Sequence, residues 1–268
     1  MILNVALVQM KVRDTREENL KIAELRIREA KEKGAEIIVL PEMFTTPYKN
    51  EYFPIFQEEF PGPTNLLLSE LSKELNVYII GGSIPEGEDG KIYNTSYVYD
   101  NSGVLIAKHR KAHLFDIDVK GKMTFKESDT LTPGNESTLF SVNGIKIGLI
   151  ICYDIRFPEF TRKLALEGAE IVIVPAAFNM TTGPAHWHLS ARARALDNQV
   201  YILMCSQSRN EEGVYVAYGN SLIASPWGDI VSSLDEKEGL LITQIDTDLV
   251  KKVREELPLL KHRREELY

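Results

Sequence analysis

The stretch that decides the fold of this chain is Ile147-Gly148-Leu149-Ile150-Ile151-Cys152-Tyr153-Asp154-Ile155-Arg156-Phe157-Pro158-Glu159. Its apolar first part predicts a buried strand, and its polar second part predicts a sharp turn with a helix just behind it. The strand ends at Cys152, so the turn presents a thiol. Helix N–H groups near such a turn favour the thiolate, the reactive form of cysteine. The alternative is a small buried hydrophobic residue, and these residues alone leave both interpretations open.

Strand and helix patterns alternate on both sides of this stretch. Asn143-Gly144 predicts a hairpin that enters the strand. We expect further strands at Ile2–Gln9, Ile37–Leu40, Val77–Ile84, Tyr93–Tyr99, Val104–Lys108, Ile171–Val174, Val200–Ser206, Asn220–Ala224, Ile230–Leu234 and Leu240–Ile245. Helices are expected between Thr15 and Gly34, along Leu67, Leu71 and Leu75, over Pro158–Glu167, and over Ala185–Asp197. The segment Lys111–Gly134 lacks a clear period and predicts a long functional loop. The alternation predicts an α/β layered architecture with a mixed sheet.

Composition limits the classes of function. The 268 residues carry a net charge of −8, so no basic surplus exists to neutralise nucleic-acid phosphates. The two cysteines, Cys152 and Cys205, do not form a disulfide framework and favour a reducing compartment, which we expect to be the cytoplasm. No apolar run approaches the roughly 18 residues of a membrane span. We expect one domain over 1–268, whose tail, 257–268, is frayed or held by another subunit.

Two more reactive side chains leave strand ends. Glu42 follows Ile37–Leu40 through Pro41, where partial burial would raise its pKa and make it a better proton acceptor. Lys111 follows Val104–Lys108 and could hold an oxyanion. The alternatives are a loop glutamate in water and a solvated basic edge. We expect both residues to converge with Cys152 at one sheet edge, in an order that suits attack on a carbonyl carbon.

The histidine pairs do not predict a metal site. His109 with His113, and His186 with His188, lack zinc-site spacing with cysteine or carboxylate support. Cys205 lies inside an apolar strand and is interpreted as structural.

Three ordered blocks resemble the signatures of the nitrilase superfamily of carbon–nitrogen hydrolases. They are Pro41-Glu42, then His109-Arg110-Lys111 with His113-Leu114-Phe115-Asp116, then Cys152-Tyr153-Asp154-Ile155-Arg156-Phe157-Pro158-Glu159. Further blocks, at 114–119, 121–128, 178–187 and 192–199, resemble the omega-amidase branch. The resemblance implies a four-layer α-β-β-α sandwich with mixed sheets and no cofactor. It also implies a homodimer formed through the helix after the nucleophile and through C-terminal segments.

The resemblance also implies the roles of particular residues. Cys152 corresponds to the nucleophile, Glu42 to the general base and Lys111 to the oxyanion stabiliser, with the Tyr153 backbone N–H as second oxyanion donor. Glu127 matches a second glutamate near the cysteine, although its local sequence alone favours a loop carboxylate.

The substrate-binding residues follow from the same resemblance. Arg156 matches an arginine that binds the substrate's distal carboxylate, and the alternative for it is a helix-cap or subunit-interface arginine. Tyr48 is a second candidate for that carboxylate, and Phe178, Met180 and Thr182 are candidates for the pocket lining. The chain departs from the pattern at Met43 and His188, where related enzymes often carry cysteine and an acidic residue.

The implied reaction is hydrolysis of the terminal amide of small dicarboxylic acid monoamides, such as 2-oxoglutaramate, 2-oxosuccinamate or succinamate, through a cysteine thioester. Another amidase or an N-carbamoyl hydrolase is the alternative within the same machinery. A non-catalytic binding protein on this fold is the alternative of a different class.

Overall fold

The structure is a computed structural model that describes residues 1–121 and 123–267. Lys122, in the block 121–128, and Tyr268, at the end of the tail, lie outside the described residues. The strands are β1 (Ile2–Gln9), β2 (Ile37–Val39), β3 (Tyr78–Ile80), β4 (Ile84–Glu88), β5 (Lys91–Tyr99), β6 (Leu105–Arg110), β7 (Asp116–Val119), β8 (Met123–Lys126), β9 (Thr138–Val142), β10 (Ile145–Leu149), β11 (Ile171–Ala176), β12 (Tyr201–Ser206), β13 (Leu222–Ala224), β14 (Ile230–Ser233) and β15 (Gly239–Asp246). The helices are α1 (Arg16–Glu32), α2 (Phe53–Phe56), α3 (Pro63–Leu75), α4 (Pro158–Leu166), α5 (Gly183–Asn198) and α6 (Asp248–Glu256), with 3-10 turns η1 (Glu127–Asp129), η2 (Cys152–Arg156) and η3 (Glu265–Leu267).

Two mixed sheets form the centre of the molecule. The first has the order β15-β1-β2-β3-β5-β4, with β6 also paired to β5, and the second has the order β14-β13-β12-β11-β10-β9. In the first sheet β1, β2 and β3 run parallel, and in the second β10, β11 and β12 run parallel. Their flanking partners β15, β9 and β13 are antiparallel. The strand ends after β2 and β10 therefore belong to different sheets.

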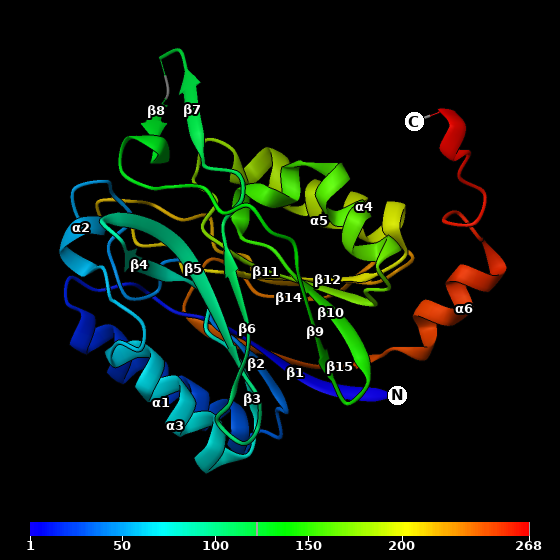
Figure 1. The fold of residues 1–268 in the computed structure, drawn as a ribbon, viewed down its shortest axis with the longest axis horizontal. Coiled ribbons are helices and arrows are strands. Elements are labelled where there is room, and N and C mark those ends of the chain that lie inside the picture. Colours follow the sequence, from blue (N-terminus) through cyan, green and yellow to red (C-terminus); the bar gives the residue numbers. More distant parts are fainter. Residues whose placement is uncertain (122, 268) are drawn as a thin grey trace.

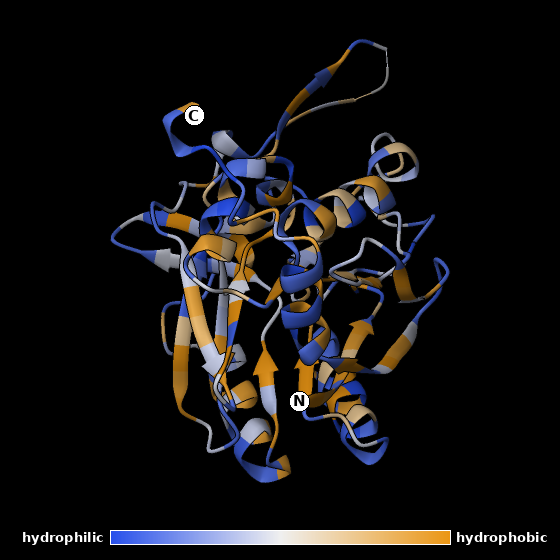
Figure 2. Cartoon of the chain, turned by 90° about the vertical axis from the view of Figure 1, so that its right-hand side faces the viewer, coloured by the Kyte–Doolittle hydropathy of each residue, from blue (hydrophilic) through white to orange (hydrophobic). Residues whose placement is uncertain are grey.

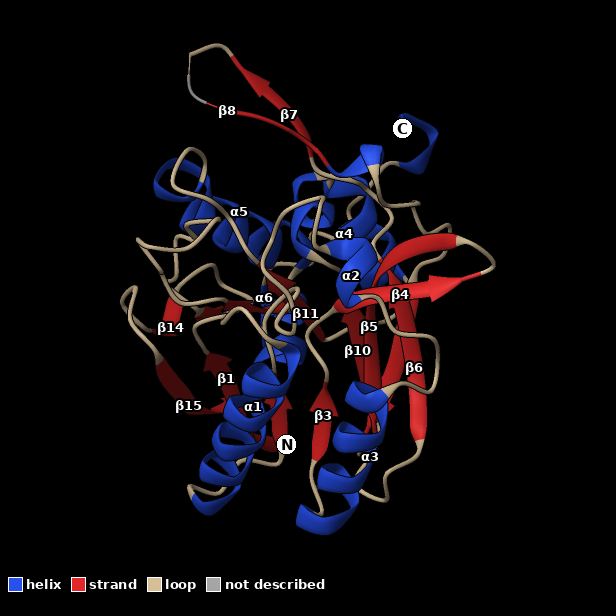
Figure 3. Cartoon of the chain, turned by 90° about the vertical axis from the view of Figure 1, so that its left-hand side faces the viewer, coloured by secondary structure: helices blue, strands red, loops and turns tan. Residues whose placement is uncertain are grey.

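Helices cover the outer face of each sheet. Figure 1 shows α1 and α3 on one side of the strands and α4 and α5 on the other. Figure 3 views the molecule from the α1 and α3 side. A core between the two sheets is built from alternate strand residues such as Leu7, Val39, Leu149, Ile173 and Leu203. Separate clusters fill the spaces beneath α1 and α3 and beneath α4 and α5. The expected four-layer α-β-β-α sandwich is confirmed.

The hydropathy of the elements follows this layering. Figure 2 shows orange strands in the interior, whereas the helices carry blue, hydrophilic faces. The parallel strands β2 and β11 are buried along their full length, as strands covered on both faces must be. In the described parts of the chain, no helix is long and apolar enough to cross a membrane.

Local signals position several elements as expected. The Thr15 hydroxyl accepts a hydrogen bond from the Glu18 N–H at 3.3 Å and caps α1. Asn143 and Gly144 adopt φ values of 50° and 84°, the positive values that a tight hairpin between β9 and β10 requires. The chain therefore enters β10, and the turn after it, in a fixed register.

The structure differs from the expected elements in three places. The single strand expected over Val77–Ile84 is divided into β3 and β4, because Gly82 turns the chain at φ 53° and a Cβ there would lie 2.1 Å from the Pro41 carbonyl oxygen. The expected loop Lys111–Gly134 contains the hairpin β7–β8, which projects from the molecule in Figures 1 and 3. The amphipathic helix α6, which buries Val250 and Val253, was not expected.

Candidate active site

The reactive side chains come from the ends of strands in both sheets. Glu42 follows β2 through Leu40-Pro41, and Lys111 directly follows β6, so both belong to the first sheet. Cys152 opens the turn η2 after β10 of the second sheet, and Glu127 follows the hairpin strand β8. The side chains of Glu42, Lys111 and Glu127 are joined by hydrogen bonds. The expected convergence thus occurs between two facing sheets, not at the edge of one.

Lys111 lies at the centre of the site. Its ammonium group donates to Glu42 Oε1 and to Glu127 Oε1, both at 2.9 Å, and all three side chains have no exposed surface. Burial alone would lower the pKa of Lys111, but the carboxylates of Glu127 and Glu42 raise it above its usual value. The alternative of a solvated basic edge at Lys111 was therefore wrong, and the site contains a fixed cation.

Only one of the two carboxylate oxygens of Glu42 accepts hydrogen bonds from the described residues. Oε1 accepts from Lys111, from Asn94 Nδ2 at 2.8 Å and from the Tyr48 hydroxyl at 3.0 Å. Oε2 is buried and accepts no hydrogen bond from residues 1–121 or 123–267. Burial raises the pKa of Glu42, as expected, with Lys111 opposing and Glu127 adding to the effect. The alternative of a loop glutamate in water was wrong, and Oε2 is available to accept a proton.

Tyr48 and Glu127 complete the polar cluster. The Tyr48 hydroxyl contacts the carboxylates of Glu127 and Glu42 and lies 3.3 Å from the Lys111 ammonium nitrogen. It has one hydrogen for two carboxylates, so its proton can serve only one of them at a time. Glu127 Oε2 accepts from the Phe115 N–H at 2.6 Å. Glu127 is completely buried, so its interpretation as a loop carboxylate was wrong.

Cys152 is held in a conformation that few residues adopt. Its φ is 44°, in the left-handed region that is strained for a side chain with a Cβ. Only 6% of the residue is exposed. Burial raises the pKa of its thiol, and the Glu42 carboxylate raises it further, while Lys111 opposes. These effects oppose the thiolate that helix N–H groups near the turn were expected to favour, so attack by this thiol requires a base.

A narrow cavity opens onto the Cys152 thiol. It is lined by side chains from several elements: Tyr48, Phe115, Cys152, Tyr153, Arg156, Ala177, Phe178, Thr182 and Tyr215. Of the expected pocket residues, Phe178 and Thr182 are therefore in place. Met180 does not line this cavity, and 40% of it is exposed.

Arg156 is the cation of this cavity. Its Nη1 donates to His186 Nδ1 at 2.9 Å, and its guanidinium carbon lies 4.4 Å from the centre of the Phe178 ring. Its Nε is buried without a hydrogen-bond partner among the described residues, and no carboxylate of those residues is among the charged groups that act on it. Burial lowers the pKa of Arg156 because the charged form is poorly solvated. A guanidinium in this state is suited to bind an anion that enters the cavity.

Two residues that hold Glu42 were not found from the sequence. Asn94 lies inside β5, and its amide donates to the Glu42 carboxylate. The Gln207 amide donates to the Glu42 carbonyl oxygen at 2.7 Å. A polar amide within a strand of mostly buried residues is a signal that could have indicated Asn94.

The histidines and the second cysteine have other partners. His109 and His113 contact the Asp154 carboxylate, and His186 accepts from Arg156. Where the chain is described, no group of three or more histidine, cysteine or acidic side chains could hold a metal ion. The Cys205 thiol donates to the Val39 carbonyl oxygen at 3.3 Å and is completely buried, which raises its pKa.

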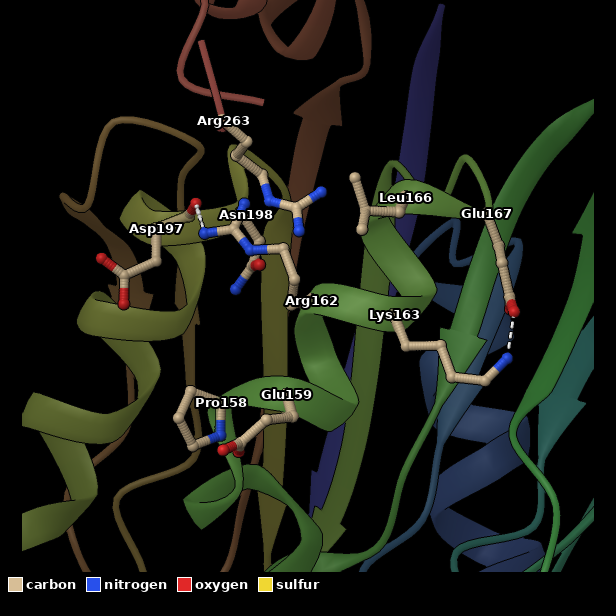
Figure 4. A pocket seen from close by; sticks show the side chains of 9 residues that line it. All are labelled: Pro158, Glu159, Arg162, Lys163, Leu166, Glu167, Asp197, Asn198 and Arg263. Atoms are coloured by element: carbon tan, nitrogen blue, oxygen red, sulfur yellow. Dashed lines mark hydrogen bonds and ion pairs between the residues drawn. The ribbon is translucent and has the colours of Figure 1, made fainter. Parts of the chain in front are cut away.

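A larger hollow than the cavity at Cys152 lies elsewhere on the described surface. It is an open groove of about 780 Å³ along the outer side of α4, bordered by Arg263 of the tail (Figure 4). None of Glu42, Lys111 and Cys152 lines it. We therefore locate the candidate active site by its chemical groups and not by the size of the hollow.

Comparison with known proteins gives a consistent result. Residues 4–255 match the family model described as carbon-nitrogen hydrolase. The chain is 48% identical to omega-amidase NIT2-A of Xenopus laevis over 98% of this chain and 96% of the relative. It is 44% identical to the human omega-amidase NIT2, with the same coverage of both chains. The crystal structure of Saccharomyces cerevisiae Nit3, a member of branch 10 of the nitrilase superfamily, is 39% identical and superimposes with a TM-score of 0.91 over 98% of this chain and 97% of that chain.

Proposed function

The chain belongs to the carbon–nitrogen hydrolase family, and from this premise we propose that it is an omega-amidase that releases ammonia from small dicarboxylic acid monoamides. The substrates in this proposal are 2-oxoglutaramate, 2-oxosuccinamate and succinamate. Each carries a terminal amide at one end and a carboxylate at the other.

The observation that carries the choice of substrate is the state of Arg156. Its half-buried guanidinium lines the same cavity as Cys152 and has no carboxylate partner among the residues described. Because the net charge of the chain is −8, an anionic substrate needs such a local cation. A substrate whose carboxylate pairs with Arg156 would extend its amide end toward the Cys152 thiol.

The proposed first half-reaction forms a thioester. The Cys152 sulfur attacks the amide carbon while its proton passes to Glu42 Oε2, the carboxylate oxygen without a partner. The Lys111 ammonium and the Tyr153 backbone N–H stabilise the resulting oxyanion. Glu42 then gives the proton to the amide nitrogen, the C–N bond breaks, and ammonia leaves.

The second half-reaction consumes water. Glu42 accepts a proton from a water molecule, and the hydroxide attacks the thioester carbon. Lys111 and the Tyr153 N–H again hold the oxyanion, which collapses with loss of the Cys152 thiolate. The thiolate recovers its proton from Glu42, and the dicarboxylic acid leaves. Glu127 keeps Lys111 charged through the cycle, since its carboxylate raises the pKa of that ammonium.

Ammonia release from 2-oxoglutaramate by the wild type and by Cys152→Ala tests the proposal. We expect loss of at least about 10³-fold in the variant, because no other group replaces the nucleophile. Undiminished activity in Cys152→Ala would falsify the assignment of the nucleophile. A parallel panel of succinamate, a neutral aliphatic amide and an N-carbamoyl amino acid distinguishes an omega-amidase from a general amidase and from an N-carbamoyl hydrolase. Intact-mass measurement of an acyl adduct distinguishes an enzyme from a binding protein.

We further propose that the chain forms a single cytoplasmic domain, 1–268, that pairs as a homodimer. The groove beside α4 in Figure 4 exposes 48% of Leu166. On α5, Leu189 is 66% exposed and Leu196 is 42% exposed. These apolar side chains support burial against a second copy. The two buried, unpaired cysteines support a reducing compartment. Sedimentation equilibrium measures the oligomeric state, and a monomer at micromolar concentration would contradict the dimer.

A further inference from the structure

Asp154 lies two residues after Cys152 and is the most heavily hydrogen-bonded carboxylate near the site. It is completely buried inside the turn η2. Its Oδ2 accepts from the Ile151 N–H at 2.9 Å and contacts His109 Nε2 at 3.2 Å. Its Oδ1 accepts from the His113 N–H at 2.9 Å and contacts His113 Nδ1 at 2.7 Å. All four contacts are with nitrogen atoms of two chain segments.

These two segments carry Cys152 and Lys111, and the proposed reaction requires a fixed distance between the thiol and the ammonium group. Ile151 immediately precedes Cys152 and lies two residues after the end of β10 of the second sheet. His109 and His113 flank Lys111 by two residues on either side, at the end of β6 in the first sheet. The Asp154 carboxylate therefore connects the oxyanion-holding segment to the nucleophile turn across the gap between the sheets.

Other contacts strengthen this connection. The His113 ring stacks on Phe157, the residue that ends η2, with ring centres 3.7 Å apart and an interplanar angle of 14°. The His109 ring contacts Thr138 Oγ1 of β9 at 3.0 Å through its other nitrogen. Burial would raise the pKa of Asp154, but hydrogen bonds from His109 and His113 lower it to about 2, so the carboxylate is ionised at neutral pH.

The connection matters because the nucleophile turn is strained. Cys152 has a φ of 44°, and a residue in such a conformation keeps it only when its surroundings hold it. The bond from the Ile151 N–H to Asp154 closes the turn around Cys152. No hydrogen bond in the described structure joins Asp154 to the side chains of Cys152, Glu42 or Lys111. Asp154 therefore does not take part in proton transfer through them.

We propose that Asp154 is a positioning residue that sets the place of the Lys111 ammonium relative to the Cys152 thiol, with His109 and His113 as its contacts on the Lys111 segment. This inference rests on the proposed function, because it assigns Lys111 and Cys152 the roles given there. It makes the spacing of the oxyanion site depend on a group that touches neither substrate nor reacting atoms. A shift of about 1 Å in such a spacing costs on the order of 100-fold in rate.

The decisive test is a matched pair at His113. Both His113→Asn and His113→Leu lose the stacking on Phe157, but only asparagine keeps a side-chain N–H donor for Asp154 near the position of Nδ1. We expect kcat for ammonia release from 2-oxoglutaramate to fall about 100-fold in the leucine variant and less than about fivefold in the asparagine variant. Equal losses in the two variants would overturn the proposal.

Alkylation of Cys152 by iodoacetamide separates positioning from general damage. This substitution has no oxyanion intermediate, so it does not use Lys111 to hold an oxyanion. The bond from Ile151 to Asp154 remains in both His113 variants, and we expect their alkylation rates to stay within about threefold of the wild type while kcat falls in His113→Leu. A parallel loss of alkylation and kcat would contradict a role in placing Lys111.

Asp154→Asn provides a second variant, with Glu58→Gln as its control. In Asp154→Asn, an NH2 group replaces one carboxylate oxygen and cannot accept hydrogen bonds from the N–H groups that face it. We therefore expect kcat to fall at least as far as in His113→Leu. Glu58 is also a buried carboxylate with several polar contacts, since it accepts two hydrogen bonds from Thr64 and forms an ion pair with Arg16. It lies outside the group of residues assigned to the site, so Glu58→Gln should keep the wild-type kcat. If Asp154→Asn does not fold, the His113 pair still decides the matter. A wild type that releases no ammonia refutes the proposed function itself, whereas an active wild type with equally active variants refutes only the role of Asp154.

Discussion

Replacing Arg156 by methionine separates substrate binding from stability. The side chain keeps most of its apolar length but loses the charge and every N–H donor. Of these donors, Nη1 donates to His186, whereas Nε has no partner among the described residues and remains available to a substrate carboxylate. The variant therefore removes a charged fork that binds no carboxylate of residues 1–121 or 123–267 in the free protein.

The expected loss of activity follows from the hydrogen bonds that a bound carboxylate would make. Two bonds between the guanidinium and a carboxylate contribute about 1.5 kcal/mol each, or about 3 kcal/mol together. At 1.36 kcal/mol for each factor of ten, kcat/KM for succinamate or 2-oxoglutaramate should fall about 150-fold. Because the carboxylate is bound both before and during the chemical step, most of this loss should appear as a higher KM.

Stability should respond differently from activity. Burial lowers the pKa of Arg156, so at neutral pH the buried charge opposes folding and its removal relieves that cost. The variant also loses the contact with the Phe178 ring at 4.4 Å, which contributes about 0.5–1 kcal/mol. These effects oppose each other, so Tm should stay within about 3 °C of the wild type.

Steady-state kinetics with a charged and a neutral amide complete the design. The neutral amide serves as the internal control, and its kcat/KM should change less than about threefold. Arg156→Lys keeps the charge without the fork and should fall between wild type and Arg156→Met. Equal losses on charged and neutral amides, or a fall in Tm of more than about 6 °C, would show that Arg156 is structural and refute the reasoning.

Three further predictions concern the polar cluster and the two cysteines. Glu42→Gln should reduce kcat by about 10³-fold, since the base is lost. The same variant should lower the pKa of the Cys152 thiol, because the Glu42 carboxylate raises that pKa in the wild type. The pH dependence of alkylation by iodoacetamide measures the pKa of the thiol. Lys111→Met leaves two buried carboxylates unpaired and should cost about 3–5 kcal/mol of stability. The pKa of Glu42 is already raised, so the folded state favours the neutral carboxyl and its contribution to stability falls as pH rises. Thermal unfolding of Lys111→Met should therefore show a larger loss of stability at pH 8 than at pH 5. An equal loss at the two pH values would contradict the pairing of Lys111 with Glu42. Iodoacetamide should label one cysteine in the native protein and none in native Cys152→Ala. The reason is that Cys205 is inaccessible and the pKa of its thiol is raised. Labelling of Cys205 without denaturant would contradict this prediction.

The local elements of the fold could be predicted because their signals are local. The hairpin at Asn143-Gly144 and the cap at Thr15 depend on residues within a few positions of each other. The hairpin β7–β8 was missed because its strands are only four residues long, too short for their regular polar–apolar alternation to stand out. The division at Gly82 depends on the approach of the Pro41 carbonyl oxygen from another part of the chain, which no window of sequence contains.

The sequence by itself determined which chemical groups are present and that three of them leave strand ends. Cys152, Lys111 and Glu42 were found in this way because a side chain after a buried strand has a predictable place. Only the tertiary structure decided the protonation of these groups, since a pKa depends on burial and on charges that the fold brings together. Helix N–H groups near the turn favour the Cys152 thiolate, but burial and the Glu42 carboxylate raise the pKa of the thiol. Glu127, which has the local sequence of a loop residue, becomes a buried partner of Lys111 because the chain returns to the site after the hairpin.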